Sequence, residues 1–471
     1  MTPRSRRAFL ERMAFATAAA ALPATRQLPR AVAAGPNDVL SAAIIGCGIR
    51  GKAHAQELAR LADCRITAVC DPDLDRVDEL AAVVEGLGRP VPRKEQDLRR
   101  VFDADDVDVV FIATPNHWHA LAAVWAMEAG KDAYVEKPLS HDVAEGRRIV
   151  ETARRLGRIV QTGMQNRSRG PLAAAIRFVR EGGIGEVTLA RSVYYGRRGS
   201  IGGPGPCAIP PRCDYDLWAG PAPLVELRRP GFHYDWHWFW DTGNGEIGNN
   251  NVHSIDICRW GLGVSGMGRR VLSYGGRFGY VDAAETPNTQ VAIIDFGDRM
   301  ILSETRGLES PPFRDGVSSM WFFEGSEGFV ADTHHYDPEG RLVKAFEGES
   351  QNHFANFLAA VRSRRREDLT AEAEEGHWSA AVCHAATISW RLGRPADPAD
   401  VAAAGEAFDS AAVGDVLDRT RDHLAAAGVD LAATPLVLGR TLAVTDDGAG
   451  FIDDAEATAL LERPARPPYL F

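Results

Sequence analysis

Residues 41–51 read Ser-Ala-Ala-Ile-Ile-Gly-Cys-Gly-Ile-Arg-Gly. The apolar residues before the first glycine predict a buried parallel strand, and a predicted helix follows the last one directly. In this Gly-x-Gly-x-x-Gly spacing, Gly46 allows a tight turn, Gly48 lets a pyrophosphate approach the backbone, and Gly51 lets helix and strand pack closely. The stretch therefore predicts a strand–turn–helix unit that binds a dinucleotide.

Two neighbouring features support this interpretation. The glycine turn itself holds Ile49 and Arg50, directly before the predicted helix, whose free N–H groups and positive dipole end favour phosphate. A second apolar strand, residues 65–70, ends at Asp71, where the motif expects an acid that binds the ribose. A carboxylate there accepts ribose hydroxyls and repels a 2′-phosphate, so NAD is favoured over NADP. The alternative is that Asp71 only caps the strand end.

The beginning of the chain has the pattern of an export signal. Arg6 and Arg7 precede an Ala-rich apolar stretch, residues 13–24, which is too short to span a bilayer. Paired arginines before a modest apolar region resemble a twin-arginine signal, and an ordinary secretory signal is the alternative. We expect residues 1–34 to be removed on export, which makes the protein periplasmic or secreted.

Charge and cysteine content narrow the possible partners. Removal of residues 1–34 takes away six Arg and one Glu, so the net charge changes from −11 to −16. This acidity argues against nucleic acid as a partner. No later segment is apolar enough for stable membrane insertion. The seven cysteines form no metal-spaced pair, and whether Cys207 and Cys213 form a disulfide stays open.

The hydrophobic pattern predicts an α/β fold with two main domains. Strands and helices alternate over residues 35–165, which predicts a Rossmann domain with a parallel sheet. Residues 166–394 show period-two alternation, which predicts a large, mostly antiparallel sheet whose open face needs helices or another subunit to cover it. Residues 395–471 form a C-terminal extension. Ligands bind beyond the carboxyl ends of parallel strands. The further cofactor candidates at that rim are Thr114, Pro115, Asn116, His119, Glu136, Lys137 and Gln165.

The segment Tyr134-Val-Glu-Lys-Pro138 holds the first candidate for chemistry. A lysine at the end of a parallel strand, facing the nicotinamide, can polarise a hydroxyl or carbonyl and move a proton. Pro138 would fix the backbone that aims Lys137. The alternative is a solvated Glu-Lys pair before a helix.

An aromatic segment holds the second candidate. Residues 231–241 contain two His, three Trp, one Tyr and two Asp, which suits a pyranose because its C–H face stacks on rings while its hydroxyls need polar partners. A buried aromatic turn is the alternative. His233 and His237 could bind a metal together with His253, but no other ligand spacing supports this, and we predict no metal.

The third candidate is the Gly/Asn-rich stretch 243–256, which opens a predicted helix. His253 and Asp256 lie three residues apart on one helix face. A histidine is a suitable base near neutral pH, and a neighbouring carboxylate can orient its ring. A capping loop with a structural histidine is the competing interpretation.

Together these motifs resemble the Gfo/Idh/MocA oxidoreductases, in particular a subgroup with twin-arginine signals. The resemblance rests on the glycine turn, Ala113-Thr-Pro-Asn-His-Trp-His119, Glu136-Lys-Pro138 and His253-x-x-Asp256, and it extends to segments 161–167, 216–220 and 463–471. It implies a Rossmann domain, NAD(P)-linked chemistry on a sugar or polyol, and dimers or tetramers.

The resemblance also implies roles for individual residues. Lys137 and His253 match the catalytic positions of the family. The family often has an aspartate four residues before that histidine, where this chain has Asn249, and Asp256 or His237 would have to replace it. The substrate candidates are Arg167, His237, Trp240, Asn249 and Asp256.

Three functions are compatible with these features. Because no NAD pool exists outside the cytoplasm, the first is an exported oxidoreductase that acts on a sugar, polyol or glycoside hydroxyl with tightly bound NAD. The second is an NAD-dependent glycosidase that works through transient oxidation and elimination. The third is a sugar-binding protein that has lost its activity.

Overall fold

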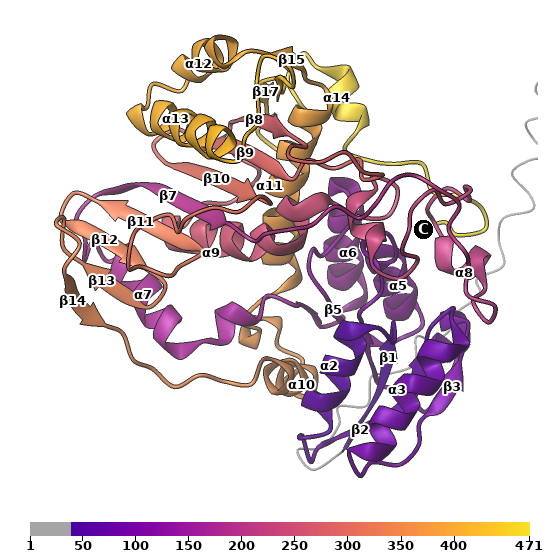
Figure 1. Cartoon of the computed structure of the whole chain (residues 1–471). Helices are drawn as coiled ribbons and strands as arrows, with labels where there is room; N and C mark the ends of the chain where they lie inside the picture. Colours follow the sequence, from indigo (N-terminus) through magenta and orange to yellow (C-terminus); the bar gives the residue numbers. More distant parts are fainter. Residues whose placement is uncertain (1–38) are drawn as a thin grey trace, which may run out of the picture. The chain divides into compact units, whose positions relative to one another are not determined.

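The computed structural model describes residues 39–471, so the predicted export signal lies outside the described residues. The first of two sheets has six parallel strands in the order β3-β2-β1-β4-β5-β6 (Figure 1). This order confirms the predicted Rossmann domain, whose ligand crevice lies where the strand order reverses, at β1 and β4. The strands are β1 (Leu40–Ile45), β2 (Cys64–Cys70), β3 (Arg93–Glu95), β4 (Val109–Ile112), β5 (Asp132–Val135) and β6 (Val160–Thr162).

Helices cover both faces of this sheet because successive residues of a strand point to opposite sides. In β1, Ala42 and Ile44 pack with α2, α3 and α10, whereas Ala43 and Ile45 pack with α4, α5 and α6. The strands are therefore buried on both faces, which explains their continuous apolar runs. The helices are α2 (Ile49–Leu58), α3 (Leu74–Gly86), α4 (Leu98–Phe102), α5 (Asn116–Glu128), α6 (Val143–Leu156) and α10 (His353–Ser363).

The second sheet has eleven strands and confirms the prediction of a large, mostly antiparallel sheet. Of its pairs only β7 with β10 is parallel. The strands are β7 (Val187–Tyr194), β8 (Arg270–Gly276), β9 (Thr289–Asp295), β10 (Met300–Arg306), β11 (Trp321–Gly325), β12 (Gly328–Ala331), β13 (His334–Tyr336), β14 (Leu342–Ala345), β15 (Arg394–Ala396), β16 (Leu436–Leu438) and β17 (Leu442–Ala443).

The C-terminal extension covers part of the face that the sequence leaves open. Helices α7, α9 and α11 pack on one face of the sheet, and α12 and α13 pack against Leu272, Val291 and Leu302 on the other. Strands β15–β17 of the same extension join the sheet edge (Figure 1). The boundaries at 165/166 and 394/395 stay predictions, as does a homo-oligomer. The helices are α7 (Gly170–Arg180), α8 (Tyr215–Ala219), α9 (Val252–Leu262), α11 (Ala373–Arg391), α12 (Pro398–Glu406), α13 (Ala411–Ala426) and α14 (Ala455–Ala459).

The last residues return to the Rossmann domain and lie against α5 and α8 (Figure 1). Tyr469 packs its ring on Trp118, and its hydroxyl donates to Asp216 Oδ2 at 2.6 Å. Arg466 pairs with the same carboxylate at 2.7 Å, and Trp125 donates to the carbonyl of Leu470. The sequence left the role of this segment open, and the structure shows that it contacts both α5 and α8.

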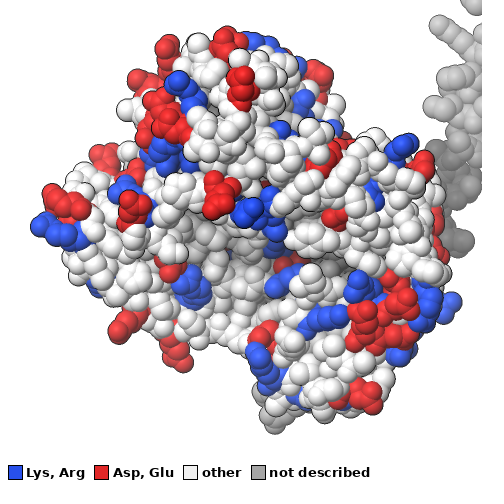
Figure 2. Space-filling view, viewed as in Figure 1, with Lys and Arg blue, Asp and Glu red and all other residues white. Residues whose placement is uncertain are grey.

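Within residues 39–471 no helix is both long and apolar enough to cross a membrane. The surface shown in Figure 2 carries acidic and basic side chains interspersed, without a broad basic face. Cys207 and Cys213, whose pairing the sequence left open, are both free thiols.

Candidate active site

A cavity of about 500 Å³ opens at the carboxyl ends of the parallel strands, bounded on the other side by the segments around α8, the aromatic turn and the start of α9. The predicted residues that line it are Gly46, Gly48, Ile49, Arg50, Asp71, Thr114, Pro115, Asn116, His119, Glu136, Lys137, His237 and Asn249. Among the further residues that line it, none of them individually predicted to bind a ligand, are Arg76, Gln96, Arg198, Leu217, Trp218, Tyr234, Trp236 and Asn250.

The three glycines of the turn have different roles, two in the packing of the fold and one at the cavity surface. A Cβ on Gly51 would lie 2.0 Å from the Gly46 carbonyl oxygen, and Gly46 itself has a φ of +93° and touches the backbone of Ala113. These two are therefore required by the fold. A Cβ on Gly48, which lines the cavity, would meet nothing within 4 Å, so packing does not require this glycine, and the close approach of a bound phosphate is the role we expect for it. No side chain caps α2, which leaves its first N–H groups for phosphate.

Asp71 lies at the end of β2 in the cavity wall, as the ribose prediction requires. Its two carboxylate oxygens accept from the backbone N–H groups of Cys47, at 2.8 Å, and Asp73, at 3.0 Å. Burial raises the pKa of Asp71 to about 6, while these two hydrogen bonds oppose the rise. Each oxygen keeps a second lone pair, so the carboxylate can also accept from ribose hydroxyls.

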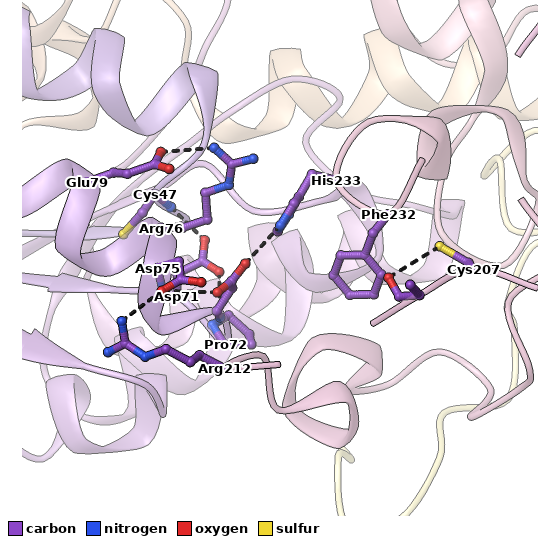
Figure 3. A network of polar contacts seen from close by, with 12 residues as sticks. Cys47, Asp71, Pro72, Asp75, Arg76, Glu79, Cys207, Arg212, Phe232 and His233 are labelled. Carbon is purple, nitrogen blue, oxygen red and sulfur yellow. Dashed lines mark hydrogen bonds and ion pairs between the residues drawn. The ribbon is translucent and has the colours of Figure 1, made fainter. Parts of the chain in front are cut away.

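A histidine connects this end of the cavity to the aromatic turn. His233 Nε2 lies 2.9 Å from Asp73 Oδ2, and Figure 3 shows the ring reaching across toward the acidic group beyond β2. Arg76, which lines the cavity, pairs with Glu79 at 2.9 Å. Since His233 has this partner and His237 contacts the Tyr234 carbonyl, neither is held in a metal-like set. Residues 39–471 contain no group of three or more His, Cys, Asp or Glu that could hold a metal ion.

Glu136 is the centre of a buried polar cluster in the wall of the cavity. Its Oε1 accepts from Arg50, from Gln165 at 3.3 Å and contacts His54 Nε2 at 2.8 Å. Burial opposes its charge, but the His54 hydrogen bond and the charge of Arg50 outweigh this and hold the pKa of Glu136 far below its usual range. Glu136 therefore stays ionised and positions Arg50. Gln165 lies outside the cavity lining and bonds Tyr134 and Glu136 instead.

Lys137 reaches from the end of β5 to the opposite wall. Its Nζ donates to the backbone oxygen of Asn249 at 2.7 Å and to the side-chain oxygen of the same residue at 3.1 Å. Burial lowers the pKa of Lys137, which makes proton exchange near neutral pH easier. Asn249 belongs to a π-helical turn, Ile247–Asn251, that continues into α9, and such turns are frequent at functional sites.

His253 follows one turn later, at the start of α9, and does not itself line the cavity. Its Nδ1 is buried and has no hydrogen-bond partner among residues 39–471. Burial and the charge of Lys137 lower its pKa to about 3, so the ring is neutral. The sequence suggested Asp256 as its orienting carboxylate, but Asp256 accepts instead from Arg167, at 2.8 and 2.9 Å, and from Ser379.

The contact between Arg167 and Asp256 shows where two of the predicted substrate residues lie. The Arg167–Asp256 ion pair is almost fully buried, and Arg167 makes a further pair with Glu375 at 3.0 Å. Neither residue lines the cavity. The physical reason is that a buried guanidinium needs a carboxylate partner, and this pair already satisfies it. Their contact with substrate stays a prediction without support from this geometry.

The aromatic turn divides between the cavity and the protein interior. His237 stacks on Trp236 with ring centroids 3.6 Å apart, and both line the cavity. Burial lowers the pKa of His237 to about 3. Trp240, which was predicted to contact substrate, instead packs on Trp390 and under Arg391 and does not line the cavity. Trp236 and His237 are thus placed where a ligand could contact them, and binding of a pyranose by this turn stays a prediction.

Several site residues carried no clear local signal. Arg198, from the segment after β7, pairs with buried Glu246 at 2.9 Å. Glu246 also accepts from Asn249 and Asn250, so it supports the oxygen that Lys137 contacts. The position of Glu246 inside the Gly/Asn-rich stretch 243–256 could have indicated that it belongs to the site. The position of His54, three residues after Gly51, could have done the same. Nothing near Arg198 in the sequence indicated its partner.

The comparisons with known proteins agree with this geometry. Residues 40–164 match the model described as "Oxidoreductase family, NAD-binding Rossmann fold" of the Gfo/Idh/MocA family, and residues 202–412 match its "C-terminal alpha/beta domain". Among solved structures, the WlbA dehydrogenase from Bordetella pertussis in complex with NADH and UDP-GlcNAcA has a TM-score of 0.57 at 19% identity. That match covers 75% of this chain and 97% of that one. GenD2 from gentamicin A biosynthesis, in complex with NAD, has a TM-score of 0.53 at 18% identity, covering 77% and 97%.

Two curated relatives are similar over a shorter stretch. A glycosyl hydrolase family 109 protein from Shewanella pealeana is 34% identical over 187 residues, which are 37% of this chain and 41% of that protein. An alpha-N-acetylgalactosaminidase from Shewanella oneidensis is 32% identical over 162 residues, 33% of this chain and 35% of that protein. The match thus spans well under half of these relatives. The two family models together cover most of residues 40–412, and the chain belongs to the Gfo/Idh/MocA oxidoreductase family, with that family's NAD-binding Rossmann domain at its N-terminal side.

Proposed function

We propose that this protein is an exported oxidoreductase that acts on a hydroxyl of a sugar, polyol or glycoside with tightly held NAD. The observation that carries the proposal is the contact of Lys137 with Asn249 in a cavity that continues, past the open space at Gly48, to Asp71. A phosphate-binding turn, a ribose acceptor and a buried amine thus occupy one cavity in the order that an extended dinucleotide and a small polar substrate require.

Bound NAD supplies a hydride acceptor beside the substrate carbon. The chain supplies the proton chemistry. Lys137 Nζ can donate a hydrogen bond to the substrate oxygen in place of Asn249, and burial eases transfer of its proton. The neutral ring of His253 has an unpartnered Nδ1, but it is buried outside the cavity lining, so a role as proton acceptor requires that substrate binding expose this atom and raise its pKa. Trp236 and His237 offer stacked ring faces for the C–H side of a pyranose.

The first test is the cofactor content of the exported protein. The protein is purified, denatured, and its supernatant assayed for NAD and NADH, and we expect about one dinucleotide per chain. Addition of a panel of sugars and glycosides to the intact protein should then reduce the bound cofactor, as followed by nicotinamide absorbance. Protein that binds NAD only weakly, or that no sugar reduces, would rule out this function.

A second candidate function is favoured by the curated relatives, which are named as glycosyl hydrolases. In an NAD-dependent glycosidase, oxidation of a ring hydroxyl acidifies the neighbouring C–H bond. Loss of that proton expels the aglycone, water then adds to the resulting double bond, and the hydride returns to the carbonyl carbon. Lys137 and His253 would serve the same proton transfers. Product analysis separates the two functions, because a keto-sugar indicates net oxidation, whereas a released aglycone without a redox product indicates hydrolysis.

A further inference from the structure

A second cavity of about 300 Å³ lies next to the first. Arg198 and Tyr234 line both cavities, so the two share a wall. The second cavity is built from the segment after β7 and from the loops that join β8 to β9 and follow β10, none of which belongs to the Rossmann domain. Its other lining residues include Arg197, Trp238, Glu246, Arg277, Tyr280 and Asn288.

The shared wall lies at the reacting end of the first cavity. Arg198 donates to Glu246 at 2.9 Å, and Glu246 accepts from Asn249, whose oxygens contact Lys137. Asp71, which marks the ribose end, is joined instead to the turn at Cys47 and to Asp73. A substrate held at Lys137 that extends away from the dinucleotide would meet Arg198 and Tyr234, the two side chains that border the second cavity.

The lining of the second cavity has aromatic rings and two arginines, Arg198 and Arg277, whose charge is compensated by a close carboxylate, whereas Arg197 approaches Glu309 only to 3.8 Å. Arg198 pairs with Glu246, and Arg277 forms a two-point pair with Asp282 at 2.6 and 2.7 Å. Such neutralised pairs attract a phosphate or carboxylate weakly but still offer hydrogen bonds to hydroxyls. Trp238, Tyr234 and Tyr280 add aromatic surface for C–H faces.

We propose that this second cavity binds the sugar unit joined to the one that reacts beside Lys137, so that the substrate has at least two pyranose rings. The inference rests on the proposed function and extends it to the size of the substrate. The volume supports a single further ring, because about 300 Å³ is at the lower end of small-molecule sites. Tyr280 is a positioning residue as well, since its hydroxyl donates to the Arg198 carbonyl at 3.2 Å.

The test measures binding by calorimetry to the NAD-loaded protein, so it does not require turnover. Three matched pairs of ligands are compared: the methyl α-glycosides of N-acetylgalactosamine, galactose and glucose, and the disaccharides in which galactose replaces each methyl group. We expect at least one disaccharide to bind about tenfold more tightly than its methyl glycoside. Tyr280→Ala should weaken binding of the disaccharide more than binding of the methyl glycoside and so reduce this difference, and Tyr280→Phe should keep most of it.

Tyr336→Ala, a substitution on β13 away from both cavities, is the control for the loss of a tyrosine ring. The inference is overturned if no disaccharide binds more tightly than its methyl glycoside, or if Tyr280→Ala weakens both members of a pair equally. A disaccharide that binds more tightly but is neither oxidised nor cleaved would refute the proposed function and leave this inference standing.

Discussion

The two walls of the main cavity are built by different means. The Rossmann wall presents Gly48, Asp71 and Lys137, which follow the ends of β1, β2 and β5 by at most three residues in the sequence. The facing wall presents Arg198, Trp236 and Asn249 from long connecting segments, which are held by contacts with distant residues. The comparison indicates that the first wall provides the cofactor site common to the family, whereas the second adapts the site to its substrate. The predictions below separate these two contributions.

The largest expected effect is the loss of turnover when Lys137 is replaced, with cofactor binding unchanged. Lys137→Met removes the amine but keeps most of the side-chain volume, so turnover should fall by roughly 10²–10⁴-fold. The NAD content should not change, because phosphate and ribose contacts lie elsewhere. Steady-state kinetics and dinucleotide analysis measure the two quantities, with Lys344→Met on exposed β14 as the control. Loss of NAD together with turnover would mean that the lysine mainly holds the cofactor.

The glycines of the Rossmann wall should separate folding from cofactor binding. Gly51→Ala forces a Cβ against the Gly46 carbonyl and should lower the free energy of unfolding by about 1–3 kcal/mol. Gly48→Ala should leave that free energy unchanged but lower NAD content at least tenfold, because its Cβ enters the cavity. Urea unfolding and dinucleotide analysis measure these effects. Gly86→Ala, whose Cβ would meet nothing, is the control. Normal NAD content in Gly48→Ala would contradict the phosphate assignment.

The ribose acceptor should make cofactor affinity depend on pH. The pKa of Asp71 is raised to about 6, so the carboxylate is ionised above that pH and becomes protonated as the pH falls through it. A protonated carboxyl loses acceptor strength, and NAD affinity should therefore be constant near pH 8 and fall below about pH 6, by at most about tenfold per unit. Calorimetric titration of cofactor-free protein across this range measures the effect. Asp71→Asn should bind NAD weakly at every pH, and the same pH profile in that variant would assign the effect to another group.

The smallest effect is expected for the C-terminal residues that contact α8, next to the facing wall. Arg466→Ala removes the ion pair with Asp216, next to Leu217 and Trp218 of the cavity lining. The free energy of unfolding should fall by about 1 kcal/mol and KM for substrate should rise a few fold, while NAD content stays unchanged. Arg341→Ala, which removes an exposed pair with Asp337, is the control. An equal loss of NAD would show that this segment supports the Rossmann wall instead.

The sequence by itself determined the Rossmann domain and most of its wall. Parallel strands end at one rim, so Gly46, Asp71 and Lys137 could be placed together from local patterns. The alternating segments likewise predicted the large, mostly antiparallel sheet. These features follow from periodicities of two and 3.6 residues and from turn chemistry, which act over a few neighbouring residues.

The tertiary structure decided most of the facing wall, of which the sequence had indicated only His237 and Asn249 as individual residues. The tertiary structure pairs Arg198 with Glu246. It also pairs Arg167 with Asp256, and this ion pair keeps both residues away from the cavity. Trp236 lines the cavity, whereas Trp240 does not. The tertiary structure also brings Arg466 and Tyr469 to α8. These outcomes depend on which buried charge finds which partner across 48 to 253 positions of sequence. The physical reason is that a buried guanidinium or carboxylate must be compensated wherever the fold places a counter-charge, and no local pattern records that choice.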